Sequence, residues 1–163
     1  MNVVVDACTL INLINGQVLQ EVPLLSSHNI YVSDNLLDQE ILNQSQKIFI
    51  EFLISENKII LLEFDLLLSD FTALKLKYDL GDGETESIAL CKKHHFLIAS
   101  DDFKARKCAI KELGEERIVG SLYFLRELVR QNFISCEDAK ISFKAMKRKG
   151  GYLPKINDNY FCE

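Results

Sequence analysis

Residues 80–106 have the sequence LGDGETESIALCKKHHFLIASDDFKAR, in which a helix-like run precedes a short apolar run and two adjacent acids. The spacing of apolar residues in Glu84–Lys93 predicts a helix, and the composition of Phe96–Ala99 predicts a strand. Placing carboxylates together at the end of an apolar strand is costly, because like charges repel and burial disfavours ionisation. Hard divalent cations such as Mg²⁺ and Mn²⁺ offset that cost, which suggests a carboxylate metal site.

The same alternation of strand-like and helix-like runs continues on both sides of this stretch. We expect strands at Val3–Val5, Asn29–Val32, Lys58–Leu62, Phe96–Ala99 and Arg117–Val119. We expect helices at Leu10–Ile14, Leu36–Glu51, Leu66–Lys77, Glu84–Lys93, Phe103–Leu113, Ser121–Gln131 and Cys136–Lys149. Strands that alternate with helices predict an α/β fold, with a parallel sheet covered on both faces.

Composition favours one globular, cytoplasmic domain that spans residues 1–163, with a tail of about a dozen residues at its end. Hydrophobic residues make up 48% of the chain and charged residues 26%. No apolar run approaches the ~20 residues of a membrane span, and no signal peptide is evident at the start. The net charge of −5 argues against broad attraction to nucleic acid but is compatible with a local basic patch.

Five cysteines are present, and no two of them form a CxxC pair. An odd count without such spacing argues against a disulfide framework and against a zinc cluster. We therefore expect reduced, mostly packed thiols.

Asp6 follows three valines, and Glu40 lies in the helical run that begins at Leu36. Because ligands of parallel sheets collect at the carboxyl ends of the strands, we expect Asp6 on that rim, with Thr9 hydrogen-bonded to it. Leu36 and Glu40 share one face of an α-helix, which places Glu40 at the border of the buried stripe. Simpler interpretations stay open for both residues: Asp6 caps the following helix, and Glu40 forms a salt bridge or lies at a solvated position on the rim.

Two acids, Glu84 and Glu86, open the expected helix of the central stretch. At about 100° per residue, Glu84 aligns with Ile88 and Cys91, whereas Glu86 lies about 200° away from Glu84. We therefore expect Glu84 to face the site and Glu86 to support it from outside. Alternatively, both acids are present only because the first turn of a helix favours negative charge.

Asp101 and Asp102 leave the predicted strand together, so their side chains point in different directions. We expect one of them to face the site and the other to support it, with Ser100 hydrogen-bonding within the cluster. The simpler interpretation is a turn or a helix cap before Phe103.

In their order, these segments resemble the PIN-domain nucleases, especially the VapC-like toxin branch. The likeness rests on Asp6 with Thr9, on Glu40, on LGDGETESIAL and on LIASDDFKAR. A prokaryotic subgroup with GExE and DDxxAR motifs is particularly similar, and RIVGSLYFLRELVRQNFIS resembles its final strand and helix. The resemblance spans nearly the whole chain.

The resemblance implies a three-layer α/β/α sandwich around a central, mostly parallel sheet of about four to five strands. It implies a toxin endoribonuclease, an RNA substrate, an antitoxin protein that blocks the site, and a homodimer. Mg²⁺ or Mn²⁺ would be held by Asp6, Glu40, Glu84, Asp101 and Asp102. The acids expected to carry the reaction are Asp6, Glu40, Glu84 and Asp102, the last favoured by register with the family's T-x-D pattern.

Such a reaction needs no histidine or serine nucleophile, because a divalent cation activates water near neutral pH. Lys104, Arg106 and Lys107 follow the acid pair and are candidate contacts to substrate phosphates. A solvated helix face explains these charges equally well.

Three other functions also use acids or a fold of this kind. A haloacid-dehalogenase-like phosphatase needs a second Asp two residues after Asp6, where this chain has Cys8. A receiver domain places its acid doublet after the first strand, whereas the doublet here comes late. A catalytically silent PIN-like module that binds RNA or protein stays open as the alternative to a nuclease.

Overall fold

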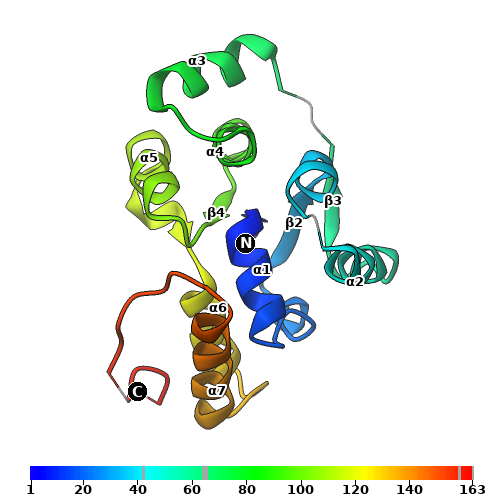
Figure 1. Cartoon of the computed structure of the whole chain (residues 1–163), viewed down its shortest axis with the longest axis vertical. Coiled ribbons are helices and arrows are strands. Elements are labelled where there is room, and N and C mark those ends of the chain that lie inside the picture. Colours follow the sequence, from blue (N-terminus) through cyan, green and yellow to red (C-terminus); the bar gives the residue numbers. More distant parts are fainter. Residues whose placement is uncertain (42, 64–65, 158, 163) are drawn as a thin grey trace.

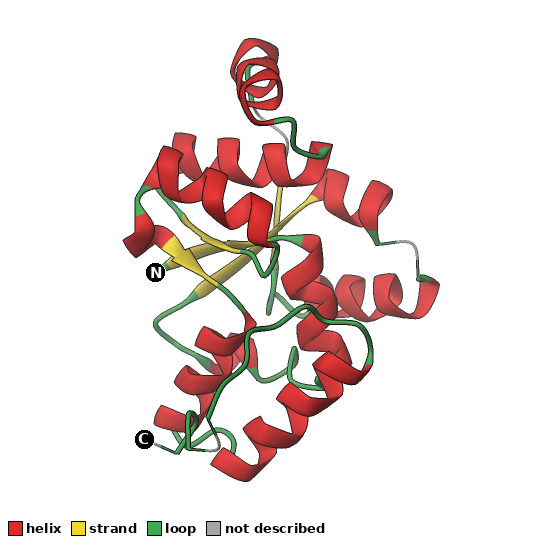
Figure 2. Cartoon of the chain, turned by 60° about the vertical axis from the view of Figure 1, so that its left-hand side comes forward, coloured by secondary structure: helices red, strands yellow, loops and turns green. Residues whose placement is uncertain are grey.

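A five-stranded sheet forms the centre of the molecule, and helices cover both of its faces (Figures 1 and 2). The computed structural model describes residues 1–41, 43–63, 66–157 and 159–162, without the side chain of residue 40. The strands are β1 (Asn2–Val5), β2 (Asn29–Ser33), β3 (Ile60–Leu62), β4 (Leu97–Ala99) and β5 (Ile118–Val119). Their order is β3-β2-β1-β4-β5, and every pairing is parallel. The α/β sandwich expected from the sequence is confirmed.

The helices lie close to the expected ranges, with one exception described below. The α-helices are α1 (Ala7–Asn15), α2 (Gln44–Ser55), α3 (Leu68–Tyr78), α4 (Asp82–His94), α5 (Phe103–Leu113), α6 (Ser121–Arg130) and α7 (Cys136–Arg148). Shorter helical segments are η1 (Val22–Leu24), η2 (Leu36–Glu40) and η3 (Glu115–Arg117). Within the described ranges, no helix has the length and apolar character needed to cross a membrane.

The exception is the helix expected over Leu36–Glu51, which is not continuous. Its first part is the π-helical η2, in which the amide of Ile41 donates to the carbonyl of Leu36 at 3.1 Å, an i→i+5 bond. The chain then leaves the helix, and α2 starts after the extended cap residue Asn43. Side-chain directions in a π-helix differ from those of an α-helix, so the i, i+4 argument that placed Glu40 on a face does not apply.

Alternate residues of β1 belong to two separate cores, because successive side chains of a strand point to opposite faces. Val3 and Val5 pack in a core that includes residues of α1, α2, α6 and α7. Val4 packs on the other side, in a core that includes residues of α3, α4 and α5. All three valines are fully buried, as expected for a central parallel strand covered on both faces.

A tail follows α7 and turns back along the molecule (Figure 1). The helix begins at a capping box formed by Ser135 and Asp138, and the chain leaves it through Gly150, whose φ of 97° is left-handed. A disulfide joins Cys136, at the start of α7, to Cys162 in the tail. The expectation of reduced thiols is therefore wrong for this pair, and it holds for the free Cys8, Cys91 and Cys108.

Candidate functional site

Asp6 lies at the carboxyl end of β1, in the middle of the sheet. Val5 pairs with Ala99 of β4, and the Asp6 amide donates to the Ala99 carbonyl at 3.0 Å. The Asp6 carboxylate caps α1, because Oδ1 accepts a hydrogen bond from the Thr9 amide at 2.8 Å. Asp6 is only 4% exposed. The capping interpretation and the expected position on the rim are thus both correct for this residue.

Burial raises the pKa of the Asp6 carboxyl from 3.8 to about 6. Hydrogen bonds from the Ser100 hydroxyl and from the Thr9 amide lower this pKa, whereas the charge of Asp101 raises it further. The thiol of Cys8 also approaches, with its Sγ 3.8 Å from Asp6 Oδ2, and burial raises the pKa of this thiol. A nearby positive charge would stabilise the ionised form of this buried carboxylate.

Asp101 is the member of the late acid pair whose charge acts on Asp6. Its Oδ2 accepts a hydrogen bond from Asn12 Nδ2 at 2.9 Å, and its Oδ1 accepts one from the Ser121 amide at 2.9 Å. The Ser121 hydroxyl also donates to Oδ2. Asp6, Asp101 and Asp102 follow the carboxyl ends of β1 and β4 and together form what we call the acid rim. Asp101 connects this rim to α1 and to the start of α6.

The side chain of Asp102 makes different contacts, because adjacent residues that leave a strand point in different directions. Its Oδ1 accepts a hydrogen bond from the Ala105 amide at 2.7 Å and so caps α5. Its own amide donates to the Ser100 hydroxyl at 3.3 Å. The expectations that Ser100 bonds within the cluster and that one acid caps a helix are both confirmed.

The acids of α4 differ from the helical-wheel expectation in their burial. Glu86 is 2% exposed, whereas Glu84 is half-buried and its carboxylate folds back over Gly81 at the start of its own helix. Assigning one buried stripe was wrong because α4 packs against α3 and α5 as well as β1, so most of its sides are covered. The buried acid of this helix is Glu86.

Glu40 ends η2, and its side chain lies outside the described part of the structure. Among the side chains that are described, no three His, Cys, Asp or Glu groups gather closely enough to hold a metal ion. Asp6 and Asp101 nevertheless supply neighbouring carboxylate oxygens, the ligand type that Mg²⁺ and Mn²⁺ prefer. In donor chemistry, these two residues fit a divalent cation.

The three residues of α5 that were expected to contact phosphates point to different surroundings. Arg106 turns inward, and its Nη1 donates to the carbonyls of Ser100 and Val119, each at 2.7 Å. Arg106 thus joins the chain just after β4 to the end of β5. Lys104 and Lys107 stay exposed, and the Lys107 ammonium lies 4.2 Å from the centre of the Phe103 ring.

Three residues beside the acids were not anticipated in these roles. Asn12 is 5% exposed and holds Asp101; a polar residue inside the apolar run LINLI was the signal that could have identified it. Gly120 is the cap position of α6, and Ser121, its first residue, bonds Asp101. Gly120 leaves room for that carboxylate, since a Cβ there would lie 2.5 Å from Asp101 Oδ1.

Comparison with known proteins bears on what this rim does. A family model described as a PIN domain matches residues 2–157. No curated protein and no solved structure gave a significant match. The matched range contains all five strands and every acid of the rim. The chain therefore belongs to the PIN-domain family, whose members are generally nucleases.

Proposed function

We propose that this chain is a metal-dependent endoribonuclease that hydrolyses phosphodiester bonds of RNA. The observation that carries the proposal is the buried carboxylate of Asp6 at the carboxyl end of β1. It is repelled by the charge of Asp101, which follows the adjacent strand β4. Burying one acid beside another is costly even with their hydrogen bonds, and a bound cation would offset that cost. In a member of a nuclease family, that charge is most simply a catalytic cation.

Mg²⁺ or Mn²⁺ would be held by Asp6 and Asp101, with further carboxylates from α4 and from Glu40. When bound, such an ion supplies a nucleophilic water at neutral pH and neutralises charge that develops on the phosphate. The protein holds its ligands in fixed positions: the Thr9 amide orients Asp6, and Asn12 with Ser121 orient Asp101.

We assign the metal-binding acid of α4 to Glu86 in place of Glu84. Glu86 is the buried acid of this helix, and its carboxylate oxygens are the donor type that Mg²⁺ and Mn²⁺ prefer. Glu84, which folds over Gly81, already has a stabilising position at the positive end of its helix. Asp102 remains a candidate ligand, although one of its oxygens caps α5.

The direct test is cleavage of varied RNAs in Mg²⁺ or Mn²⁺ by the wild type and by three isosteric variants. Asp6→Asn and Glu86→Gln should each lower the rate at least about 100-fold, equivalent to a few kcal/mol of transition-state stabilisation. Glu84→Gln is the matched control on the same helix, and its rate should stay within about threefold of wild type.

Two results would contradict parts of this proposal. A large loss in Glu84→Gln with an active Glu86→Gln would return the ligand role to Glu84. If the wild type binds RNA but cleaves none with either ion, the chain is the catalytically silent module instead.

The resemblance to VapC-like proteins extends the proposal to a cytoplasmic toxin, with an antitoxin protein as partner and a homodimer as its assembly. A toxin of this kind slows growth when expressed alone. The growth test compares wild type with Asp6→Asn: equal growth of the two strains at equal protein levels would contradict the toxin role.

A further inference from the structure

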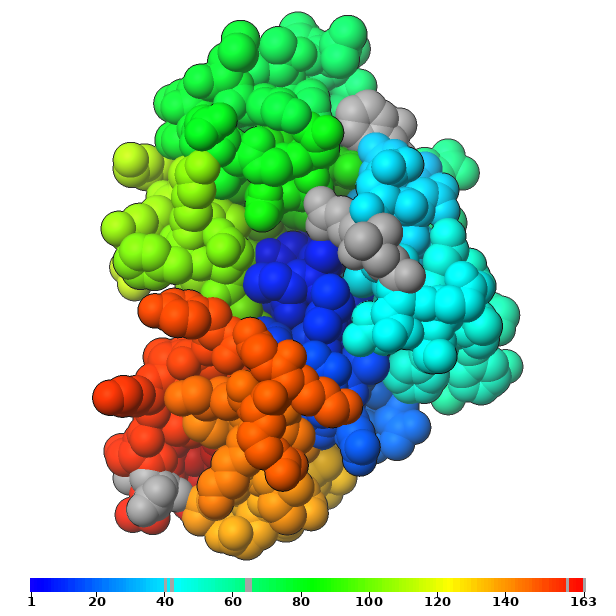
Figure 3. Space-filling model, viewed as in Figure 1, coloured from blue at the N-terminus to red at the C-terminus, as the bar shows by residue number. Residues whose placement is uncertain are grey.

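A cavity of about 510 Å³ opens beside the acid pair, between α1, the start of α5 and the beginning of the tail. The N-terminal segment lies recessed there between neighbouring elements in the space-filling view (Figure 3). The lining residues that matter here are Asp101, Asp102, Phe103, Lys104, Lys149 and Tyr152. A ligand in this cavity would therefore touch the proposed catalytic rim.

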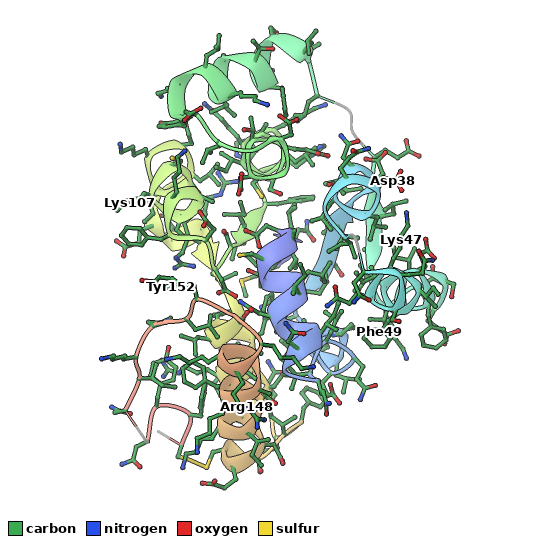
Figure 4. All side chains as sticks on the ribbon, in the orientation of Figure 1. Asp38, Lys47, Phe49, Lys107, Arg148 and Tyr152 are labelled. Carbon is green, nitrogen blue, oxygen red and sulfur yellow. A yellow bond between two sulfur atoms is a disulfide. The ribbon has the colours of Figure 1, made fainter. Side chains whose placement is uncertain are left out.

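Two aromatic rings in this lining are unusually open to water. Tyr152 is 90% exposed and Phe103 is 64% exposed. Figure 4 shows Tyr152 in the space beside α5, at the start of the tail. Leaving such rings in water forgoes the hydrophobic free energy that burial would give. Rings at the mouth of a polar cavity are well suited to stacking against flat ligands.

Basic side chains gather near the two rings, beside the acids Asp101 and Asp102 of the same cavity, although the chain as a whole carries −5. Lys104 and Lys149 line the cavity, Lys107 lies over the Phe103 ring, and Arg148 precedes Lys149. Lys104 also meets Asp79 across 3.7 Å, but both side chains are exposed and such pairs are weak. Exposed rings interleaved with lysines match the chemistry of single-stranded nucleic acid, whose bases stack and whose phosphates attract cations.

We propose that Phe103 and Tyr152 are stacking platforms for two bases of a single-stranded RNA that crosses the acid rim, with Lys104 and Lys149 on neighbouring phosphates. This inference rests on the proposed nuclease function and adds the residues that hold the substrate beside the acids. Duplex RNA is excluded from the platforms, because its bases are already stacked and paired inside the helix.

Binding is tested in full-length protein carrying Asp6→Asn, which prevents cleavage, with a fluorescein-labelled single-stranded oligoribonucleotide of mixed sequence. Phe103→Leu and Tyr152→Leu should each raise the Kd about 5-fold to 100-fold, since they keep apolar bulk but remove the π face. Phe103→Tyr and Tyr152→Phe keep a ring and should bind within about twofold of the parent. Phe52→Leu, at a 51% exposed ring on α2, is the matched control and should leave the Kd unchanged.

The outcomes separate this proposal from the nuclease proposal. Unchanged Kd values in both leucine variants would overturn the stacking platforms, even if the wild type cleaves RNA. So would an equal loss of affinity for the duplex form of the same sequence. Stacking-dependent binding by a wild type that never cleaves would leave the platforms standing and refute the nuclease. Failure to bind any single-stranded RNA would overturn both.

Discussion

Gly120 shows how closely single residues control the acid rim. A Cβ at this position would lie 2.5 Å from Asp101 Oδ1 and 3.2 Å from both Arg106 Nη1 and the Ser100 carbonyl. Gly120→Ala should therefore displace the Asp101 carboxylate from its present position. A displacement of this size should lower the rate of RNA cleavage about 10-fold to 100-fold. Steady-state cleavage assays measure the effect, with the thermal midpoint recorded to confirm folding.

The control for this substitution is Gly81→Ala, the same change at the start of α4. There the added Cβ meets only the end of the flexible Glu84 side chain, which can rotate away. We expect a rate within about threefold of wild type. If Gly120→Ala cleaves RNA as fast as Gly81→Ala, the position of Asp101 is not important for the reaction.

Single residues also show how much of the candidate site could be predicted from the sequence. Spacing located the elements that carry Asp6 and the late acid pair, because strand ends of a parallel sheet share one rim. It could not distinguish Glu84 from Glu86, since α4 is covered on several sides and a one-stripe wheel assumes a single buried face. Side-chain partners such as Asn12 depend on contacts distant in sequence, which no local pattern records.

At the scale of elements, Glu112 of α5 ties together the helices on the Val4 side of the sheet. It accepts hydrogen bonds from Lys77 Nζ at 2.7 Å, from Lys92 Nζ at 2.6 Å and from the Tyr78 hydroxyl at 2.6 Å. Its side chain is only 6% exposed. These partners, led by Lys77, lower the pKa of the Glu112 carboxyl from 4.5 to about 2.

A lowered pKa makes the contribution of Glu112 dependent on pH. The stabilisation is fully present above the unfolded pKa of 4.5 and is lost as pH falls towards 2. Glu112→Gln should lower the free energy of unfolding at pH 7 by about 1–2 kcal/mol, because both lysines face water and weaken the pairing. Urea unfolding at several pH values should show the difference from wild type shrinking between pH 4.5 and 2.

Glu137→Gln is the comparison variant for this measurement. Glu137 pairs with Lys140 at 2.7 Å within α7, but its side chain is 71% exposed. Its replacement should cost no more than about 0.5 kcal/mol at pH 7. Equal losses in the two variants, or a Glu112→Gln difference that persists at pH 2, would contradict the pairing account.

Element boundaries also show where sequence patterns succeed. Short apolar runs predicted all five strands, since a sheet buried on both faces requires continuous apolar residues. The break between η2 and α2 was missed, because residues 36–51 have helical spacing throughout and the π-helical turn depends on how Leu36 and Ile41 pack. Both residues are buried in the core of the Val3 side.

For the molecule as a whole, the tail is the part that sequence patterns could not place. It has no helical or strand periodicity, and the link between Cys136 and Cys162 spans 26 positions. Together the tail and α6 border a cavity of about 820 Å³ that reaches Asp101. Tyr152, the proposed stacking residue, belongs to the same tail. The disulfide therefore restrains a segment that contributes to both cavities.

This disulfide should be measurable in the stability of the whole chain. Closing a loop of this length restricts the unfolded state, so reduction should lower the free energy of unfolding by about 2–4 kcal/mol. Urea unfolding of wild type with and without reductant measures the difference. A variant with Cys136→Ser and Cys162→Ser should match the reduced wild type and show no response to reductant. Thiol titration of unfolded, unreduced wild type should find the three free cysteines, Cys8, Cys91 and Cys108. Five reactive thiols, or unfolding that does not respond to reductant, would show that no disulfide joins the tail to α7.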